Sequence, residues 1–387
     1  MTGPLHGLRI IEIAGIGPGP FCGMMLADHG AEVIRVERPG GVRAGSGSAP
    51  ARDPLQRSRR SITVDLKHAD GIAIVRALAR ASDGLIEGFR PGVMERLGLG
   101  PKVLLADNPK LVFGRITGWG QDGPWSGKAG HDIDYIALSG SLNAFGEAGR
   151  KPVAPINMVA DFGGGGMLLA FGMLAALLNV QRGGQGQVVD ASMLEGSALL
   201  MSMIWGFRAQ GSWNDARGTN RLDGGAHFYD TYETADGKYV AIGAVEPQFY
   251  AALCRGLELD PDLADPRLQS DPAQWLRLKH AIAERFRTKS RAQWDSIFAD
   301  LDACYAPILS FDEALTHPHN SARATFGAFG GVTQPMPAPR YSSSATTTPR
   351  MSGTMPDEGD AILAEIGTES AQIAKWRAGG ALAARQD

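Results

Sequence analysis

Short runs of β-branched and apolar residues alternate with amphipathic stretches in the first part of the chain. Residues 8–13 and 32–36 predict strands, and residues 21–29 between them predict a helix that stops at Gly30. A loop rich in glycine and proline, residues 15–20, joins the first strand to the helix. The chain is therefore expected to open with strand, loop, helix and strand.

The same alternation continues to about residue 116. Further strands are predicted at 61–66, 84–87 and 111–116, and helices at 69–81 and 93–97. Strands that alternate with helices form parallel sheets whose two faces are both covered. The pattern predicts an α/β fold with a large, doubly wound, Rossmann-like domain on a mostly parallel sheet.

The second half of the chain changes character. Apolar stretches at 161–179 and 191–210 predict long helices on either side of a short strand at 188–190, whereas strands at 228–233 and 237–243 and a helix from Pro247 are typical of a smaller α+β unit. A last helix, 357–378, is expected to pack on the first domain. The expected organisation is a large domain at 1–200 and 330–387, a linker at 201–225, a small domain at 226–320 and a linker at 321–356.

Composition indicates a globular protein, because 44% of the 387 residues are hydrophobic and 20% are charged. The net charge of −3 gives no basic excess for nucleic acid. Residues 1–11 do not resemble a signal peptide, and the most apolar stretch, 167–178, is too short to span a bilayer. Three scattered cysteines match neither a disulfide framework nor a zinc site, so we expect a cytoplasmic protein.

The glycine-rich loop invites a dinucleotide-binding interpretation. It lies between a strand and a helix, and Glu37 follows at the spacing of a ribose-binding acid. However, Pro20 stands where the fingerprint requires glycine, and Pro18 removes a backbone N–H that a pyrophosphate would use. A tight turn that opens a helix is the favoured interpretation.

Basic residues gather after the second predicted strand, opposed by only two acidic residues. They are Arg38, Arg43, Arg52, Arg57, Arg59, Arg60 and Lys67. Arg90 and Arg96 follow a later strand. Arginines beyond the carboxyl ends of parallel strands are suited to phosphate groups. A solvated loop explains Arg43 and Arg52 better, and for Arg38 both explanations stay open.

Three segments place ionisable groups in unusual settings. His131 follows a glycine-rich turn, Glu246 ends a strand, and Asp161 opens a glycine-rich apolar helix with Asn157 four residues before it, on the same helical face. A carboxyl in apolar surroundings has a raised pKa, which suits proton transfer near neutral pH. Taken singly, such residues are more often structural, as satisfied histidines or helix N-caps.

Several segments resemble the family III coenzyme-A transferases, and the resemblance covers nearly the whole chain. They are AEVIRVERPG at 31–40, RSITVDLK at 60–67, FRPGV at 89–93, TGWGQDGP at 117–124 and GQGQVVD at 184–190. Within the family, GHDIDY at 130–135, LDGG at 222–225 and GAVEPQFY at 243–250 are similar to a branch that racemises 2-methylacyl-CoA thioesters. The transferases usually carry an aromatic residue in place of His131.

The resemblance implies an interlocked homodimer, with each active site between the large domain of one chain and the small domain of the other. It implies that the coenzyme-A moiety is held by Arg38, Leu66, Lys67, Arg90 and Arg96. The substrate would be an acyl-CoA, with coenzyme A part of the substrate and no metal or further cofactor. Nothing in it points to nucleic acid or to membrane insertion.

The resemblance also assigns chemical roles. His131 and Asp161 would flank the α-carbon, and Glu246 from the partner chain would orient His131. Asn157 would support Asp161, and the backbone N–H of Asp132 is our candidate donor to an enolate oxygen.

Two alternatives stay open. Asp161 could be the nucleophile of a coenzyme-A transferase, forming an acyl anhydride, or the chain could be a non-catalytic acyl-CoA-binding protein. His317 and His319, separated by one proline, are interpreted as a turn and not as metal ligands.

Overall fold

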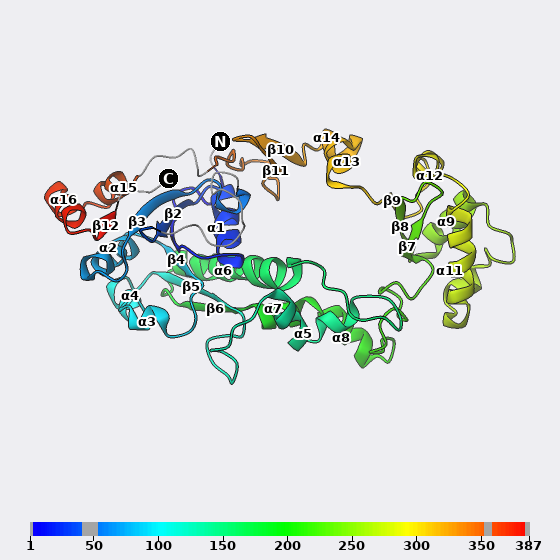
Figure 1. The fold of residues 1–387 in the computed structure, drawn as a ribbon, viewed down its shortest axis with the longest axis horizontal. Coiled ribbons are helices and arrows are strands. Elements are labelled where there is room, and N and C mark those ends of the chain that lie inside the picture. The colour runs from blue at the N-terminus through cyan, green and yellow to red at the C-terminus, as the bar shows by residue number, and fades with distance from the viewer. Residues whose placement is uncertain (1–2, 41–52, 352–357, 384–387) are drawn as a thin grey trace. The chain divides into compact units, whose positions relative to one another are not determined.

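The computed structural model describes residues 3–40, 53–351 and 358–383, and its contacts divide the chain into two compact units. Unit 1 contains residues 1–139, 156–200 and 321–387, and unit 2 contains 140–155 and 201–320. Unit 1 therefore combines the two ends of the chain, which carry the blue and red colours in Figure 1.

Unit 1 is built on a seven-stranded sheet with the strand order β12-β3-β2-β1-β4-β5-β6. The strands are β1 Arg9–Ile13, β2 Glu32–Glu37, β3 Arg60–Val64, β4 Gly84–Glu87, β5 Val112–Thr117, β6 Val188–Ser192 and β12 Leu382–Ala383. β12 pairs antiparallel with β3, and the other neighbours pair in parallel. The expected α/β fold with a large, mostly parallel sheet is confirmed.

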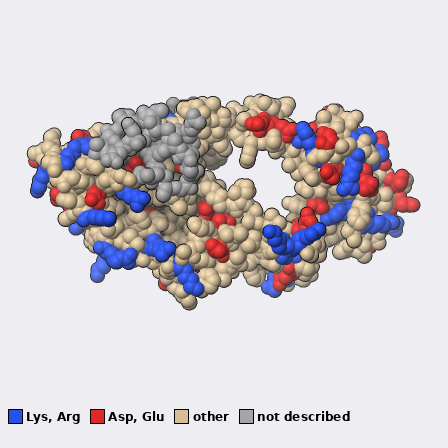
Figure 2. All heavy atoms as spheres, viewed as in Figure 1, with Lys and Arg blue, Asp and Glu red and all other residues tan. Residues whose placement is uncertain are grey.

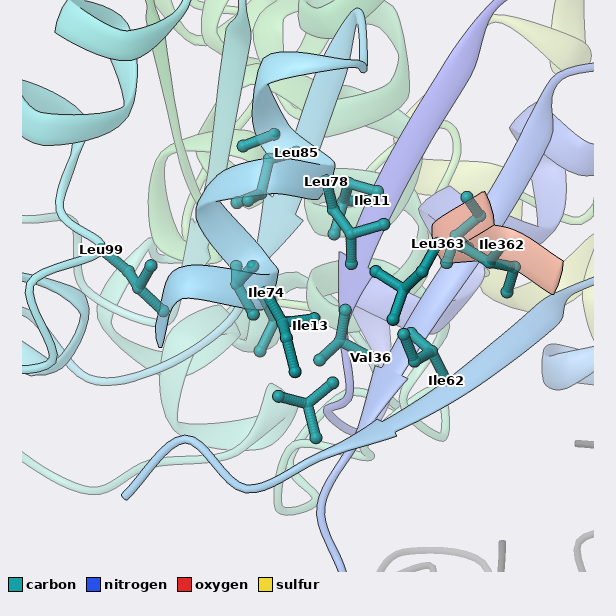
Figure 3. Packing of buried hydrophobic residues seen from close by; sticks show 14 of the residues in the cluster. Ile11, Ile13, Val36, Ile62, Ile74, Leu78, Leu85, Leu99, Ile362 and Leu363 are labelled. Carbon is teal, nitrogen blue, oxygen red and sulfur yellow. The ribbon is translucent and has the colours of Figure 1, made fainter. Parts of the chain in front are cut away.

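Helices cover this sheet on both faces. They include α1 Pro18–Asp28, α2 Ala69–Arg80, α3 Val93–Arg96, α4 Pro101–Asp107, α5 Asp132–Leu138, α7 Met193–Leu200, α15 Gly359–Glu365 and α16 Ser370–Ala378. Ile11 and Ile13 of β1 point into a core shared with Leu78 of α2 and Ile362 of α15 (Figure 3). The alternate residue Glu12 lies on the opposite face, against Gly23 of α1. The two faces of β1 thus pack against different helices, α2 and α15 on one side and α1 on the other.

The long apolar helix differs from its prediction. It starts as a π-helical segment, η4 Met158–Met167, and continues as α6 Leu168–Gln181. Its 24 residues make it longer than the apolar stretch 167–178, and by length and composition alone it could cross a membrane. In unit 1 it instead packs on β5 and β6 and against α1 and α7.

Other predicted elements are divided in the structure. The helix expected at 191–210 is two helices, α7 and α8 Ser202–Ala209, with a break at Met201. The helix expected at 357–378 is also two, because Gly367 adopts a φ of +83° between α15 and α16; its first residue, 357, lies outside the described residues.

The segment 321–356, predicted to be a linker, contains a hairpin that belongs to unit 1. Its strands are β10 Phe326–Phe329 and β11 Val332–Pro335. Residues 352–356 of that prediction lie outside the described residues. Short elements elsewhere are η2 Pro54–Gln56, η3 Ser141–Ala144, α13 Phe311–Thr316 and α14 Pro318–Ala322.

Unit 2 has an antiparallel sheet in the order β7-β8-β9, formed by Tyr229–Glu233, Tyr239–Gly243 and Tyr305–Pro307. Its other helices are α9 Pro247–Leu257, α10 Pro266–Gln269, α11 Pro272–Phe286 and α12 Arg291–Phe298. Phe286 and Trp294 are central to its core. Arg291 of α12 pairs with Glu313 of α13 at 2.6 Å. Acidic and basic side chains are interspersed on the face that Figure 2 shows.

Candidate active site

A cavity of about 310 Å³ opens at the carboxyl ends of β1 to β4 in unit 1. Val36 and Ile86 are among its apolar lining residues, and Glu37 among its polar ones. Two of the predicted ligand residues, Arg38 and Leu66, also line it. This edge of the sheet is where open α/β folds bind their ligands.

A buried group of charges supports the loop beside this cavity. Glu12 is fully buried and pairs with Arg35, and it accepts a 3.0 Å hydrogen bond from Nε of Arg59. Nη2 of Arg35 donates to the carbonyl of Gly15 at 3.3 Å. These contacts fix the start of the 15–20 loop, since removing one charge would leave the others unpaired in the interior.

The buried side chain of Glu87 also fixes the turn that carries Arg90. Oε2 of Glu87 accepts a 2.7 Å hydrogen bond from the backbone N–H of Phe89, and Oε1 accepts one of the same length from Nε of Arg115. Burial raises the pKa of Glu87, against the opposing effect of these donors. Phe89 lines the cavity, and Arg90, the next residue in the chain, is exposed.

Among the described residues, the other basic residues predicted to bind coenzyme A do not line the cavity. Lys67 is exposed and follows Leu66, and Arg96 is exposed in the last turn of α3. Arg43 and Arg52 lie outside the described residues.

His131 stands directly before α5, with its side chain exposed. Its backbone N–H donates to Oδ2 of Asp134 at 2.9 Å, and the hydroxyl of Tyr135 donates to the carbonyl of Gly130. The first turn of α5 therefore holds the peptide group that joins Gly130 to His131. The carbonyl of His131, in the next peptide group, accepts from the backbone N–H groups of Asp134 at 2.9 Å and Tyr135 at 3.2 Å. The N–H of Asp132, at the first helical position, has no partner within the helix and is available to an acceptor.

Asp161 lies in the first part of η4 and is half-buried. Nδ2 of Asn157 donates to its Oδ2 at 3.0 Å, which confirms that these two side chains share a face. Burial raises the pKa of Asp161, and the charge of Asp132 adds to that effect, whereas the Asn157 hydrogen bond and the charge of His131 lower it. The structure thus brings His131, Asp132, Asn157 and Asp161 into one electrostatic neighbourhood.

The glycine-rich loop contributes a wall to this neighbourhood. Gly17 has a φ of +66°, and a Cβ at that position would lie 3.7 Å from Oδ2 of Asp161. Gly165 and Gly166 of η4 pack in turn on Pro18 of the loop. The loop that resembles a nucleotide fingerprint therefore borders the carboxylate of Asp161.

Glu246 belongs to unit 2, where it is exposed and precedes α9. The backbone before it is held by Gln269, whose Nε2 donates to the carbonyls of Ala244 and Val245 at 3.0 Å each. Glu246 is therefore presented on a fixed turn, in a different unit from His131.

Sequence reasoning assigned no role to Tyr135, which burial and the charges of Asp161 and Asp134 give a pKa raised to about 12. Its position inside the GHDIDY segment was the available signal. In the described ranges 3–40, 53–351 and 358–383, no cluster of three or more His, Cys, Asp or Glu side chains could hold a metal ion, and His317 and His319 belong to no such cluster.

Comparison with known proteins shows which family this chain resembles. The model of CoA-transferase family III matches residues 5–360. The chain is 47% identical to the α-methylacyl-CoA racemase of Mus musculus, over 89% of this chain and 87% of that protein. It is 46% identical to the racemase of the same name from Homo sapiens, over 83% and 82% respectively. A solved CaiB/BaiF family protein from Brucella suis superposes with a TM-score of 0.81 at 26% identity, covering 95% of this chain and all of that one.

Proposed function

The chain belongs to CoA-transferase family III, and from that premise we propose that it is an isomerase that racemises 2-methylacyl-CoA thioesters. The observation that carries the proposal is the pairing of His131 with Asp161. Two groups able to exchange a proton lie within reach of each other's charge, and one of them has a raised pKa because of burial.

The proposed reaction is a 1,1-proton transfer through an enolate. One residue of the pair removes the α-proton from one face of the carbon, and the other returns a proton to the opposite face. Neutral His131 and protonated Asp161 serve one direction, and the protonation states are exchanged in the other. The reaction needs no metal or redox cofactor, because protons alone are moved and the thioester itself acidifies the α-carbon.

The thioester oxygen gains negative charge as the proton leaves, so it needs preorganised donors. The N–H of Asp132 is the proposed donor. The carbonyl of the same peptide group, that of His131, accepts from the backbone N–H groups of Asp134 and Tyr135, and these bonds hold the peptide in place. Because such a donor is fixed in place before the proton is removed, it stabilises the enolate without the reorganisation that water would require.

The coenzyme-A moiety is proposed to bind at the cavity, which Arg38 and Leu66 line, with the exposed Arg90 as a further ligand. Lys67 and Arg96 complete the proposed set. Arginine and lysine suit a ligand with several phosphate charges.

We also propose that two copies of the chain form an interlocked dimer, in which the large domain of one copy meets the small domain of the other. Unit 1 exposes large apolar side chains on η4, α6 and α7: Met158 is 58% exposed, Phe171 70% and Leu199 60%. Such a surface fits burial against a second copy. Glu246 of that copy would accept a hydrogen bond from His131 and fix its tautomer. The compartment is proposed to be the cytoplasm, since Cys22, Cys254 and Cys304 are all free thiols.

Incubation of a single enantiomer of a 2-methylacyl-CoA with the protein in D₂O tests the proposal. The expected result is deuterium at C2 together with loss of stereochemical purity. Absence of exchange with every 2-methylacyl-CoA tried would contradict it. If Asp161 is instead the nucleophile of a transferase, its carboxylate attacks the thioester and coenzyme A leaves, so hydroxylamine should trap an acyl anhydride on that residue when acyl-CoA is supplied without an acceptor acid. Binding without either reaction would leave only an acyl-CoA-binding protein.

A further inference from the structure

The carboxylate of Asp132 joins the two segments that carry the proposed acid/base pair. It is 3% exposed, and its Oδ2 accepts hydrogen bonds from the backbone N–H groups of Ala160 at 2.7 Å and Asp161 at 2.8 Å. Asp132 directly follows His131 in the chain. One oxygen atom therefore connects the backbone next to His131 with the backbone of Asp161.

We infer that Asp132 is a positioning residue, whose side chain sets the place of Asp161 relative to His131. This inference rests on the proposed function and adds to it, because there only the backbone N–H of Asp132 had a role. Proton transfer on opposite faces of one carbon requires two groups at a fixed separation, and an error of about 1 Å can reduce the rate about 100-fold.

The need for a cap explains why the contact exists. The first N–H groups of any helix lack partners within it, and a nearby side chain usually accepts from them. At η4 the N-cap residue is Asn157, but its side chain makes no cap hydrogen bond and its amide donates to the carboxylate of Asp161 instead. The cap therefore comes from α5, through Asp132.

Capping η4 with the buried carboxylate of Asp132 is energetically unfavourable in one respect, so the cap is expected to have a role besides stability. Oδ1 of Asp132 is buried without a hydrogen-bond partner in the part of the chain that the structure describes. Burying a carboxylate with one oxygen unsatisfied is unfavourable, because that oxygen has lost its hydrogen bonds to water without replacement. A local Ser or Asn cap would avoid that penalty. A second carboxylate of α5, that of Asp134, accepts from the backbone N–H of His131. Asp134 therefore holds His131, and Asp132 holds Asp161.

Three variants separate position from charge. Asp132→Asn keeps an oxygen at the same place and removes the charge. Asp132→Glu keeps the charge and moves the oxygens by about one carbon–carbon bond, about 1.5 Å. Asp132→Ala removes the acceptor. The matched control is Asp271→Ala, since Asp271 caps α11 in unit 2 by accepting from the N–H of Ala273 at 3.0 Å.

Two measurements are made on each full-length variant. Hydrogen–deuterium exchange of the peptide containing residues 158–163 reports the N–H groups that Asp132 holds, and it does not depend on activity. The kcat and KM for α-proton exchange are measured at the pH optimum of each variant. We expect Asp132→Ala and Asp132→Glu to lose protection in that peptide and to have a kcat about 10- to 100-fold below wild type with little change in KM. Asp132→Asn should keep the protection and exceed both in kcat, and Asp271→Ala should keep the wild-type kcat.

The inference is overturned if Asp132→Glu matches or exceeds Asp132→Asn, because charge and not position would then matter. It is equally overturned if protection of residues 158–163 is the same in all variants. Should Asp132→Ala not fold, the Asn and Glu variants alone give the comparison. Wild-type protein without α-proton exchange would refute the proposed racemase, and the exchange protection would still report on the contact itself.

Discussion

Gly17→Ala is the most informative single substitution near the proposed acid/base pair. Gly17 precedes α1 with a φ of +66°, and an added methyl would meet Oδ2 of Asp161 at 3.7 Å. That distance is an ordinary van der Waals contact, so the methyl fits without moving the carboxylate. Two separate effects remain, which are backbone strain and the loss of water next to Asp161.

The backbone effect is expected to lower the free energy of unfolding by about 1–3 kcal/mol, because residues with a side chain rarely adopt this conformation. The local effect acts on Asp161. Burial already raises the pKa of that carboxyl, and a methyl that excludes more water disfavours the ionised form further. In the direction in which Asp161 takes the proton, activity falls as the pH drops through its pKa. A higher pKa therefore moves this acidic limb of the kcat profile to higher pH.

The assay is the pH profile of α-deuterium exchange from each enantiomer, together with denaturant unfolding. Gly7→Ala is the matched control, because Gly7 also has a positive φ, of +92°, but no neighbour within 4 Å of an added Cβ. Both variants should lose stability, and only Gly17→Ala should move the acidic limb. If the limb stays in place while stability falls in both, the loop does not border the working carboxylate and the reasoning is wrong.

Three further predictions concern the stability and binding of the same unit. Asp161→Asn should abolish racemisation and make the protein more stable at neutral pH. Burial raises the pKa of Asp161 in the folded state above its value in the unfolded state. The contribution of Asp161 to stability is therefore full below the unfolded-state pKa and is lost as the pH rises through the folded-state pKa. The stability gained by Asp161→Asn should vanish in acid, and denaturant titrations at two pH values measure it. Arg90→Ala should raise the KM for acyl-CoA about 10- to 100-fold at unchanged kcat and melting temperature, because an exposed charged donor to phosphate is lost. Glu12→Ala should lower the free energy of unfolding by about 3–5 kcal/mol, since Glu12 is a charge partner of two buried arginines. Glu32→Ala removes two more exposed ion pairs, with Arg9 and Arg60, and should change that free energy by at most about 1 kcal/mol for each pair.

The strands were the most predictable part of the fold. β4 has the bounds 84–87 that the sequence predicts, and β1 and β2 differ from their predictions by one residue. Each is a run of β-branched or apolar residues with glycine or proline nearby, so its limits are local properties of the chain. The break at Met201 was not predictable in this way, because it follows no glycine or proline. The break between α15 and α16 does have a local signal, Gly367.

In the candidate site, too, contacts within one segment were predictable and contacts between segments were not. The i, i+4 spacing of Asn157 and Asp161 was sufficient to predict their contact. The approach of His131 to Asp161, and the hydrogen bonds of Asp132 to the start of η4, join parts of the chain about thirty residues apart. Such contacts depend on how α5 packs against η4, which no local pattern encodes; only the resemblance to a family put these residues in one site.

Two glycine-rich runs that looked unrelated in the sequence are the two sides of one contact. A Cβ on Gly166 of η4 would lie 2.7 Å from the carbonyl of Pro18, and one on Gly165 would lie 3.3 Å from the Cβ of Pro18. At these two positions η4 can approach α1 this closely because it lacks side chains there. Pro18 and Pro20 leave few N–H groups at the start of α1, which removes the donors that a pyrophosphate would need. Because the same approach brings Gly17 next to Asp161, this loop shapes the surroundings of a carboxylate, and its glycines do not require a dinucleotide-binding fingerprint to explain them.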